Sequence, residues 1–396
     1  MSCHPLYLPE GIPMALRPPY ETDPVLLAVA AEVPKPVFST TELLDHARPQ
    51  FSDKLLDMVG NLGITKRHSI LANYPDVIFH GADPKLDTET ADLAVASARA
   101  AMAKADIAPG KIGLVLGVTS SPGRLLPSLV CDVIARMPEL PRDVANLSIE
   151  YMGCSAMAKV VETCRWYLAA NPGKQVLTVF TEAITPLSPP LSGSYRHFTE
   201  VPTAQRQSTV DALHAFLFAD ASVAMVFGAH GKGPSFGPVK NLTNDLPEDT
   251  ELGTVPDGGS DIPVVQADHG RRLYTLSPEV TPRGSRYAKQ TIAAVLDDPA
   301  CTLNTPGDAS VFFMHTGSTR ILDALCEGFL IEKNSPVAAA SYNVLRDYAN
   351  TLGCSVPLMV AEEVRRPGGQ GLVCAFGLSF SAGAFTINIP AEGWMP

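Results

Sequence analysis

The chain has 396 residues, of which 46% are hydrophobic and 18% charged, a balance typical of a globular protein rather than a disordered one. Its formal net charge of −11 argues against a nucleic-acid partner, because phosphate binding requires a basic surface. The eight cysteines show no Cys-x-x-Cys and no zinc-binding spacing, and most lie in apolar runs, as free thiols of a reducing compartment do. The first residues lack the basic segment and apolar core of a signal peptide, and no apolar run is long enough to span a membrane. We therefore expect a cytoplasmic protein.

The first part of the chain predicts a succession of strands and helices. Ser39 or Thr40, followed closely by Glu42, is the pattern of a helix cap. In chain order we expect a proline-rich surface arm (1–24), a β-like run (25–33), two short helices (40–46 and 54–61), an alanine-rich helix (88–104), a buried strand (111–118) and an apolar helix (127–137).

The stretch LSIEYMGCSAMAKVVETCRWYLAA, residues 147–170, follows as a β-like run, a sharp turn and an apolar helix. Gly153 allows the backbone to turn, and Cys154 stands at the bend. A cysteine in the first turn of a helix lies at the positive end of the helix dipole, so we expect its thiol pKa to be lowered. A small buried residue that only packs the turn is the structural alternative.

A further strand is expected at residues 175–180, after which the pattern breaks. Residues 185–210 hold four prolines and little periodicity, and we interpret them as a long insertion. Residues 215–227 predict a strand, a tight turn and a second strand. Residues 228–262 are rich in Gly, Pro and Asp and predict the seam between two halves.

The second part repeats the first. A buried strand at 311–314 precedes a helix at 319–329, a weaker strand at 338–342, a second Gly-Cys-Ser at 353–355 and a strand at 371–376. The interval from the strand to Gly-Cys-Ser is 40 residues in the first half (113 to 153) and 42 in the second (311 to 353). This repetition predicts a duplicated α/β domain with β-α-β-α-β halves. The expected boundaries are an arm at 1–24, an N-terminal half at 25–235 and a C-terminal half at 236–396.

These stretches resemble the thiolase superfamily, and within it the chalcone-synthase-type (type III) polyketide synthases and the ketoacyl-ACP synthase III enzymes. Met152-Gly153-Cys154-Ser155-Ala156 is similar to the nucleophile turn. FFMHTGSTRILDAL, residues 312–325, resembles the segment of the catalytic histidine, which falls on His315. YANTLGCSVPLMVAEEVRR, residues 348–366, resembles the segment of the catalytic asparagine, which falls on Asn350. The resemblance implies a thiolase-like fold with five layers, αβαβα.

The resemblance also implies roles for single residues. Cys154 would take an acyl group from a thioester with His315 as its ion-pair partner, and His315 and Asn350 would stabilise the enolate formed when a malonyl group loses carbon dioxide. The Cys154 N–H and one from the Gly377–Ser379 loop would form the oxyanion hole. Phe218 would line the pocket, and Leu126 would reach a second subunit of a homodimer. Alone, Asn350 also fits a helix cap or turn, Phe218 a core position, and His197 and His214 the surface.

The chain departs from the family in two places. The Gly-Phe-Gly-Pro-Gly loop of chalcone-synthase-type enzymes is replaced by Ala375-Phe376-Gly377-Leu378-Ser379, which puts the shape of the pocket in doubt. The early basic helix that holds coenzyme A phosphates in the family keeps Lys54 but carries Asp57 and Asn61 at two other basic positions. The thioester carrier is therefore left open between coenzyme A and an acyl carrier protein, and we expect no cofactor beyond these substrates.

The residues leave three other functions open. The chain could pass the acyl group to an alcohol, amine or carbon nucleophile without decarboxylation. It could act as a thiolase with Cys374 as second cysteine, although the Gly-His-Pro signature is absent. It could also be a non-catalytic partner of a condensing enzyme, although the Cys, His and Asn set argues for activity. The predicted function is decarboxylative Claisen condensation of an acyl starter with a malonyl thioester in polyketide or secondary-metabolite biosynthesis.

Overall fold

A computed structural model describes residues 23–191, 204–255, 275–363, 368–377, 381–392 and 394. Residues 1–22 of the expected surface arm, residues 192–203 of the 185–210 insertion, which include His197, and the expected oxyanion-loop residue Ser379 lie outside the described residues. Within these ranges, no helix is both long and apolar enough to cross a membrane.

The main sheet of the described residues has the strand order β11-β12-β13-β8-β1-β7-β6-β4-β5. β4 runs parallel to β5 and β6, and β11 runs parallel to β12, whereas the remaining neighbours are antiparallel. The two parts of the sheet meet at a single β1–β8 pair, Val25 with Ser235. The strands are β1 (Val25–Glu32), β4 (Ile112–Thr119), β5 (Ala145–Glu150), β6 (Gln175–Glu182), β7 (Ala221–Gly228), β8 (Ser235–Thr243), β11 (Phe312–Met314), β12 (Gly369–Gly377) and β13 (Ser381–Ile389).

Helices cover both outer faces of this sheet and fill the space between its two parts. Most of them are close to the predicted ranges. The α-helices are α1 (Thr40–Ala47), α2 (Asp53–Gly60), α3 (Tyr74–His80), α4 (Thr90–Lys104), α5 (Leu129–Arg136), α6 (Ala156–Ala170), α7 (Ala204–Leu217), α8 (Val280–Leu296), α9 (Thr319–Gly328), α10 (Ala339–Tyr348) and α11 (Ser355–Glu363).

Shorter elements complete the described chain. Two pairs of short strands lie outside the main sheet, β2 with β3 and β9 with β10. They are β2 (Val37–Ser39), β3 (Lys66–His68), β9 (Gly253–Thr254) and β10 (Thr275–Leu276), and the 3₁₀ turns are η1 (Pro109–Lys111), η2 (Gly153–Ser155), η3 (Thr185–Leu187), η5 (Pro247–Glu251), η6 (Pro306–Asp308) and η7 (Leu352–Cys354).

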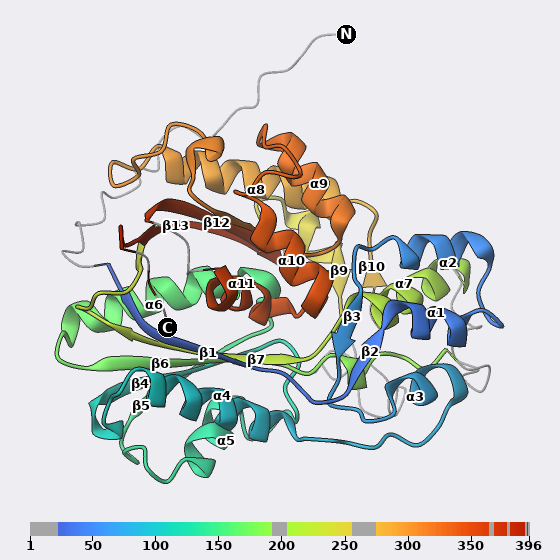
Figure 1. Ribbon diagram of the computed structural model, residues 1–396, viewed down its shortest axis with the longest axis horizontal. Coiled ribbons are helices and arrows are strands. Elements are labelled where there is room, and N and C mark those ends of the chain that lie inside the picture. Colours follow the sequence, from blue (N-terminus) through green and yellow to red (C-terminus); the bar gives the residue numbers. More distant parts are fainter. Residues whose placement is uncertain are drawn as a thin grey trace.

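The elements stack in five layers, as the resemblance implied (Figure 1). Helices α6 and α11 lie in the middle, between β12 and β13 on one side and β1, β6 and β7 on the other. Helix α4 covers the outer face of β1, β6 and β7, and α8 covers β8, β12 and β13. Because both middle helices touch a sheet on each side, they are apolar around most of their circumference, as buried helices are.

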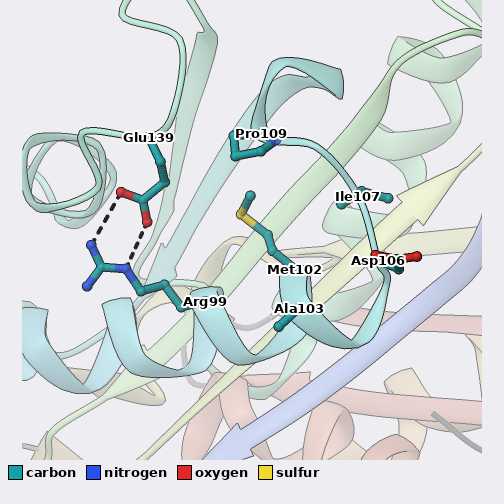
Figure 2. A pocket seen from close by; sticks show the side chains of 7 residues that line it. All are labelled: Arg99, Met102, Ala103, Asp106, Ile107, Pro109 and Glu139. Carbon is teal, nitrogen blue, oxygen red and sulfur yellow. Dashed lines mark hydrogen bonds and ion pairs between the residues drawn. The ribbon is translucent and has the colours of Figure 1, made fainter.

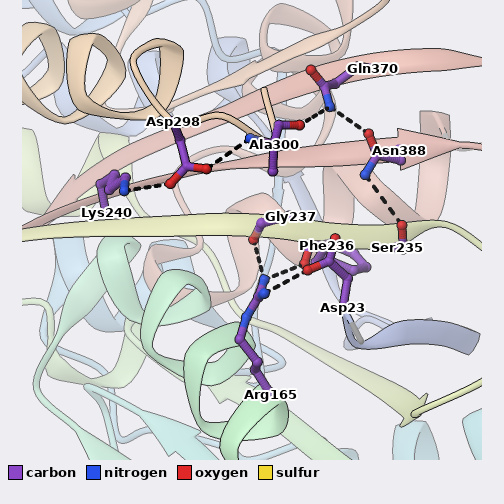
Figure 3. Close-up of polar contacts among 10 residues, drawn as sticks. All are labelled: Asp23, Arg165, Ser235, Phe236, Gly237, Lys240, Asp298, Ala300, Gln370 and Asn388. Atoms are coloured by element: carbon purple, nitrogen blue, oxygen red, sulfur yellow. Dashed lines mark hydrogen bonds and ion pairs between the residues drawn. The ribbon is translucent and has the colours of Figure 1, made fainter. Parts of the chain in front are cut away.

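The middle layer is held to the sheet by polar contacts as well as by packing. Arg165 on α6 donates to the carbonyl oxygens of Phe236 at 2.8 Å and Gly237 at 2.5 Å, and forms an ion pair with Asp23 at 2.6 Å (Figure 3). This guanidinium lies largely out of solvent, and fixed carbonyl acceptors satisfy its donors there. The helix that begins at the nucleophile turn is thereby attached to β8.

Several local predictions are confirmed. Ser39 caps α1 in a capping box with Glu42, as the spacing predicted. The second Gly-Cys-Ser turn, η7, opens α11 just as η2 opens α6, and the two turns lie against each other. The duplication that the sequence predicted is therefore present in the fold, with Gly153-Cys154 and Gly353-Cys354 in equivalent places.

Two predicted strands are wrong. Residues 215–217 end helix α7, and only Phe218 pairs, as an isolated bridge with Asn350. Residues 339–342 begin helix α10, where Ala340, Ser341, Val344 and Leu345 are buried with helical spacing. Alanine has the highest helix propensity, and a short apolar run cannot by itself distinguish a buried strand from a buried helix.

Two further interpretations are corrected. The stretch expected as a seam contains β8, which pairs with β13 along most of its length. His214, expected at the surface, is only 9% exposed because it lies on the inner side of α7. The division into halves near residue 235 remains a prediction.

Candidate active site

The nucleophile turn lies where β5 gives way to α6. Tyr151 and Gly153 adopt positive φ angles of 59° and 53°, so the chain reverses sharply before Cys154. The Gly153 amide donates to Ser120 Oγ at 2.9 Å, which ties the turn to the loop after β4. Cys154 is only 3% exposed.

Asn350 faces this cysteine from the other half of the chain. Its Oδ1 accepts from the Leu352 amide at 2.9 Å and from Cys154 Sγ at 3.8 Å. The residues on either side of this turn, Ala349 and Leu352, have φ angles of 58° and 44°. Such angles are unfavourable for residues with a Cβ and are typical of sites where the surrounding structure imposes the backbone geometry. Asn350 Oδ1 is thus held as an acceptor from both sides of the site.

The expected low pKa of Cys154 is wrong for this arrangement. Burial between the sheets raises the pKa of the thiol well above its ordinary value, and the nearby Glu182 carboxyl raises it further. Cys154 is therefore a neutral thiol that donates to Asn350.

His315 follows β11, and its ring stacks on Phe376 with 4.1 Å between centroids. Burial lowers the pKa of His315 to about 3, so the ring is neutral near pH 7. Within the described part of the chain, its Nδ1 has no hydrogen-bond partner, and no hydrogen bond links the ring to Cys154 or Asn350. The expected cysteine–histidine ion pair is consequently not formed here.

Gly377 ends β12 directly beside the nucleophile turn. A Cβ at this position would lie 2.4 Å from the Met152 carbonyl oxygen and 3.4 Å from the Cys154 amide nitrogen. The close approach therefore requires glycine. Its role in an oxyanion hole, together with Ser379, remains a prediction.

Phe218 connects this group to a polar cluster that the sequence did not predict. Phe218 bridges Asn350, and its ring meets that of His214 edge-on at 4.8 Å. His214 Nδ1 lies 2.9 Å from Ser188 Oγ, and burial lowers the pKa of His214 to about 4. Only the spacing of four residues between His214, in the last turn of α7, and Phe218, just after that helix, could have indicated this neighbourhood.

The two remaining predicted residues lie on the surface. Leu126 is 84% exposed, and Lys54 is exposed in the first turn of α2. Arg320, which sequence reasoning missed, is exposed in the first turn of α9. This helix begins against the end of α2, where the Thr319 amide donates to the Leu62 carbonyl at 3.1 Å.

A surface pocket of about 240 Å³ lies elsewhere, at the end of α4 (Figure 2). Arg99 and Glu139 on its wall form an ion pair at 2.8 Å, and none of the candidate active-site residues lines it. Within the described ranges, no group of three or more His, Cys, Asp or Glu side chains could hold a metal ion. The pocket is therefore separate from the proposed chemistry.

Comparisons with known proteins agree with the two resemblances. Residues 29–196 match the model of the FAE1/type III polyketide synthase-like proteins, and residues 303–389 match the C-terminal model of 3-oxoacyl-[acyl-carrier-protein] synthase III. A β-ketoacyl-[acyl-carrier-protein] synthase III from Nitratidesulfovibrio vulgaris is 26% identical over 314 residues, which cover 75% of this chain and 82% of that protein.

Two solved structures share the fold over nearly the whole chain. The C-terminal type III polyketide synthase domain of a hybrid type I/III enzyme from Dictyostelium superposes with a TM-score of 0.72 at 18% identity, covering 92% of this chain and 99% of that one. The 3-oxoacyl-(acyl carrier protein) synthase III from Pseudomonas aeruginosa superposes with a TM-score of 0.68 at 18% identity, covering 93% of this chain and 98% of that one. The chain thus has a thiolase-like fold and is an acyl-transferring condensing enzyme, similar both to the type III polyketide synthases and to the ketoacyl-ACP synthases III.

Proposed function

We propose that Cys154 carries an acyl group and that Asn350 and His315 promote decarboxylation of a malonyl thioester, so that the chain catalyses a decarboxylative Claisen condensation. The observation that carries this proposal is the 3.8 Å approach of Cys154 Sγ to Asn350, two residues from opposite halves of a duplicated fold. A nucleophile and an amide donor held together out of water are what the two half-reactions require.

In the first half-reaction, Cys154 attacks the carbonyl carbon of an acyl thioester. The thiol must lose its proton, the bond to the carrier sulfur breaks, and the carrier leaves as a thiol after taking up a proton. His315 is the proposed base because it falls on the catalytic histidine position of the resemblance. Burial lowers its pKa to about 3, so this role requires the bound substrate to raise that pKa toward neutral. The Cys154 amide and the end of β12 at Gly377 are proposed to hold the carbonyl oxygen.

In the second half-reaction, a malonyl thioester loses carbon dioxide and leaves an enolate. The electron pair of the breaking C–C bond moves into the enolate, whose oxygen needs fixed donors. The Asn350 amide and His315 Nε2 are proposed to supply them. The enolate carbon then attacks the acyl group on Cys154, releasing the free thiolate and a β-ketoacyl thioester.

The carrier of these thioesters is proposed to be coenzyme A or an acyl carrier protein, with no further cofactor. Lys54, and Arg320 near the other end of α2, are proposed to attract the negative charge of the carrier. Free cysteines at seven described positions fit a cytoplasmic location.

A homodimer is also proposed. Strand β5 ends the sheet, with Leu147 46% exposed, and Leu126 is exposed in the loop after β4. An unpaired edge strand and an exposed leucine are both features that a second copy would cover. Sedimentation should give a dimer at micromolar concentration that Leu126→Asn weakens, whereas Leu330→Asn, at another exposed leucine, should not. A monomeric wild type would contradict this assembly.

Intact-protein mass spectrometry tests the first half-reaction. Incubation with a panel of acyl thioesters should add one acyl mass to the wild type and none to Cys154→Ala. A wild type that stays unacylated by every thioester would contradict the proposal.

A further inference from the structure

Glu182, at the end of β6, is a carboxylate almost entirely withdrawn from solvent, with an exposed fraction of 1%. The Ser120 amide donates to both of its oxygens, at 3.1 Å and 3.0 Å. Ser121 Oγ lies 2.5 Å from Oε2 and itself receives the Ala183 amide hydrogen, so its own proton points to Glu182. On this side, Glu182 fixes the loop that follows β4.

The same carboxylate reaches the other half of the chain. The Gly353 amide donates to Oε1 at 3.2 Å. A Cβ at Gly353 would lie 2.9 Å from that oxygen, so only glycine lets the carboxylate come this close. Gly353 lies in η7, the turn that begins two residues after Asn350.

The hydrogen bonds of Glu182 to Ser120 and to Gly353 both lead to the candidate active site. Ser120 Oγ accepts a hydrogen bond from the amide of Gly153, the residue that precedes Cys154. On the other side, Gly353 follows Leu352, whose amide is held by Asn350 Oδ1. One buried side chain therefore links the backbone on which the nucleophile stands to the backbone that presents the amide.

We propose that Glu182 is a positioning residue that fixes Cys154 relative to Asn350, and that its carboxylate slows the reaction of the Cys154 thiol with electrophiles. The part that concerns condensation rests on the proposed function. The part that concerns thiol reactivity rests on the place of the carboxylate beside the turn of Cys154: a Cβ on Gly353 would lie 2.9 Å from Glu182 Oε1 and 3.6 Å from the carbonyl oxygen of Gly153, the residue before Cys154.

The charge of Glu182 follows from its surroundings. Its neighbours present N–H and O–H donors, which favour the carboxylate, while burial raises the pKa of Glu182 to about 7. The titratable groups that face it are Cys154 on η2 and Cys354 on η7, and the carboxyl raises the pKa of both thiols. Asp220, before β7, adds to the effect at Cys354. The charge beside Cys154 thus changes near neutral pH.

Glu182→Gln separates the charge from the geometry. A glutamine oxygen can still accept from Ser120 and Gly353, and its amide can donate to Ser121 Oγ. Glu182→Ala removes both the charge and the link. Ser121→Ala is the matched control, because it removes one donor and leaves the carboxylate and both backbone contacts in place.

The test measures the pH profile of Cys154 alkylation by iodoacetamide, followed by peptide mass. Glu182→Gln should shift the profile to lower pH and alkylate about three- to tenfold faster at a fixed pH below the thiol pKa, because a fall of about one unit raises the thiolate fraction tenfold and lowers its nucleophilicity. Ser121→Ala should show no such shift to lower pH. A Glu182→Gln profile that coincides with the wild type would overturn the proposed electrostatic role.

The positioning role is read from carbon dioxide release with malonyl thioester. Glu182→Gln should keep most of the wild-type rate, and Glu182→Ala should fall at least tenfold below Glu182→Gln. Equal rates in Glu182→Ala and the wild type would overturn it. If Glu182→Ala does not fold, Gly353→Ala, whose Cβ displaces the carboxylate, takes its place with the same expected loss. A wild type with a Glu182-dependent alkylation profile but no condensation would refute the proposed function and leave the electrostatic inference standing.

Discussion

Cys154 Sγ donates to Asn350 Oδ1 across 3.8 Å, although 196 positions of the chain separate the two residues. The contact exists because the two Gly-Cys-Ser turns of the duplicated fold lie against each other in the middle layer. The proposed nucleophile thereby faces the proposed amide donor from a distant part of the chain.

Acylation should occur at Cys154 and not at the equivalent Cys354. Cys354 is fully buried, its thiol donates to the Ala221 carbonyl at 3.3 Å, and its thiol pKa is raised by burial and then by the Glu182 charge. Mass spectrometry of peptides after treatment with an acyl thioester should find the label on Cys154 in the wild type and in a folded Cys354→Ala variant. Label that follows Cys354 instead would overturn the site assignment.

Gly317→Ala should disturb His315 without unfolding the protein. A Cβ at Gly317 would lie 2.8 Å from His315 Nε2 and 2.5 Å from Ile321 Cδ1, so the ring must move. Carbon dioxide release should fall about 100-fold, the loss expected when one oxyanion donor is misplaced. Gly173→Ala is the control, because a Cβ there meets nothing within 4 Å. A normal rate in Gly317→Ala would place His315 outside the reaction.

The burial of His315 predicts a contribution to acid lability. Its pKa is about 3 in the folded protein, against an ordinary value of 6.5, so between these values the unfolded chain binds more protons. Stability from this group is complete above pH 6.5 and is lost as the pH falls toward 3. Between pH 6.5 and pH 5, the free energy of unfolding measured in urea should therefore fall less in His315→Gln than in the wild type. The difference should be up to about 1.4 kcal/mol for each pH unit.

His230→Gln is the control for this measurement, because His230 is exposed. It should leave the pH dependence of unfolding as it is in the wild type. An unchanged pH dependence in His315→Gln would mean that water reaches the ring and that its neutral form is not enforced.

The sequence predicted what is local. The capping box of α1, the turn before Cys154 and the repeated Gly-Cys-Ser are determined by residues within a few positions of one another. Parts of the helices α7 and α10 were predicted as strands. A short apolar run such as residues 215–218 fits both the 3.6-residue period of a helix and the two-residue period of a strand, and only its packing partners decide between them.

The charge states could not be predicted in this way. The pKa of Cys154 is governed by burial between two sheets and by Glu182. The strands that bury Cys154 and the Glu182 carboxyl come from parts of the chain that are distant from it in sequence. The same holds for the contact of His214 with Phe218, which depends on α7 being a helix. The resemblance supplied Cys154, His315 and Asn350, and only the fold shows which of them touch.

The role of the Asn350 amide can be tested with a substitution that preserves the turn at this residue. Asn350→Asp keeps an oxygen to accept the Leu352 amide but has no N–H to donate. Removing one such donor should raise the barrier by about 2.7–4 kcal/mol, or ~100–1,000-fold in rate. The acyl step does not use this donor, but the new carboxyl lies beside Cys154 Sγ and disfavours its thiolate. Asn350→Asp should therefore be acylated at Cys154 more slowly than the wild type but to the same single acyl group, and its decarboxylation is measured after loading.

Release of carbon dioxide from a malonyl thioester by the purified protein tests the central claim most directly. The wild type, given an acyl thioester as well, should release carbon dioxide together with a β-ketoacyl product, and Asn350→Asp should do so ~100–1,000-fold more slowly while still accepting the acyl group. A wild type that releases none, but passes its acyl group to an added alcohol or amine, would contradict the claim.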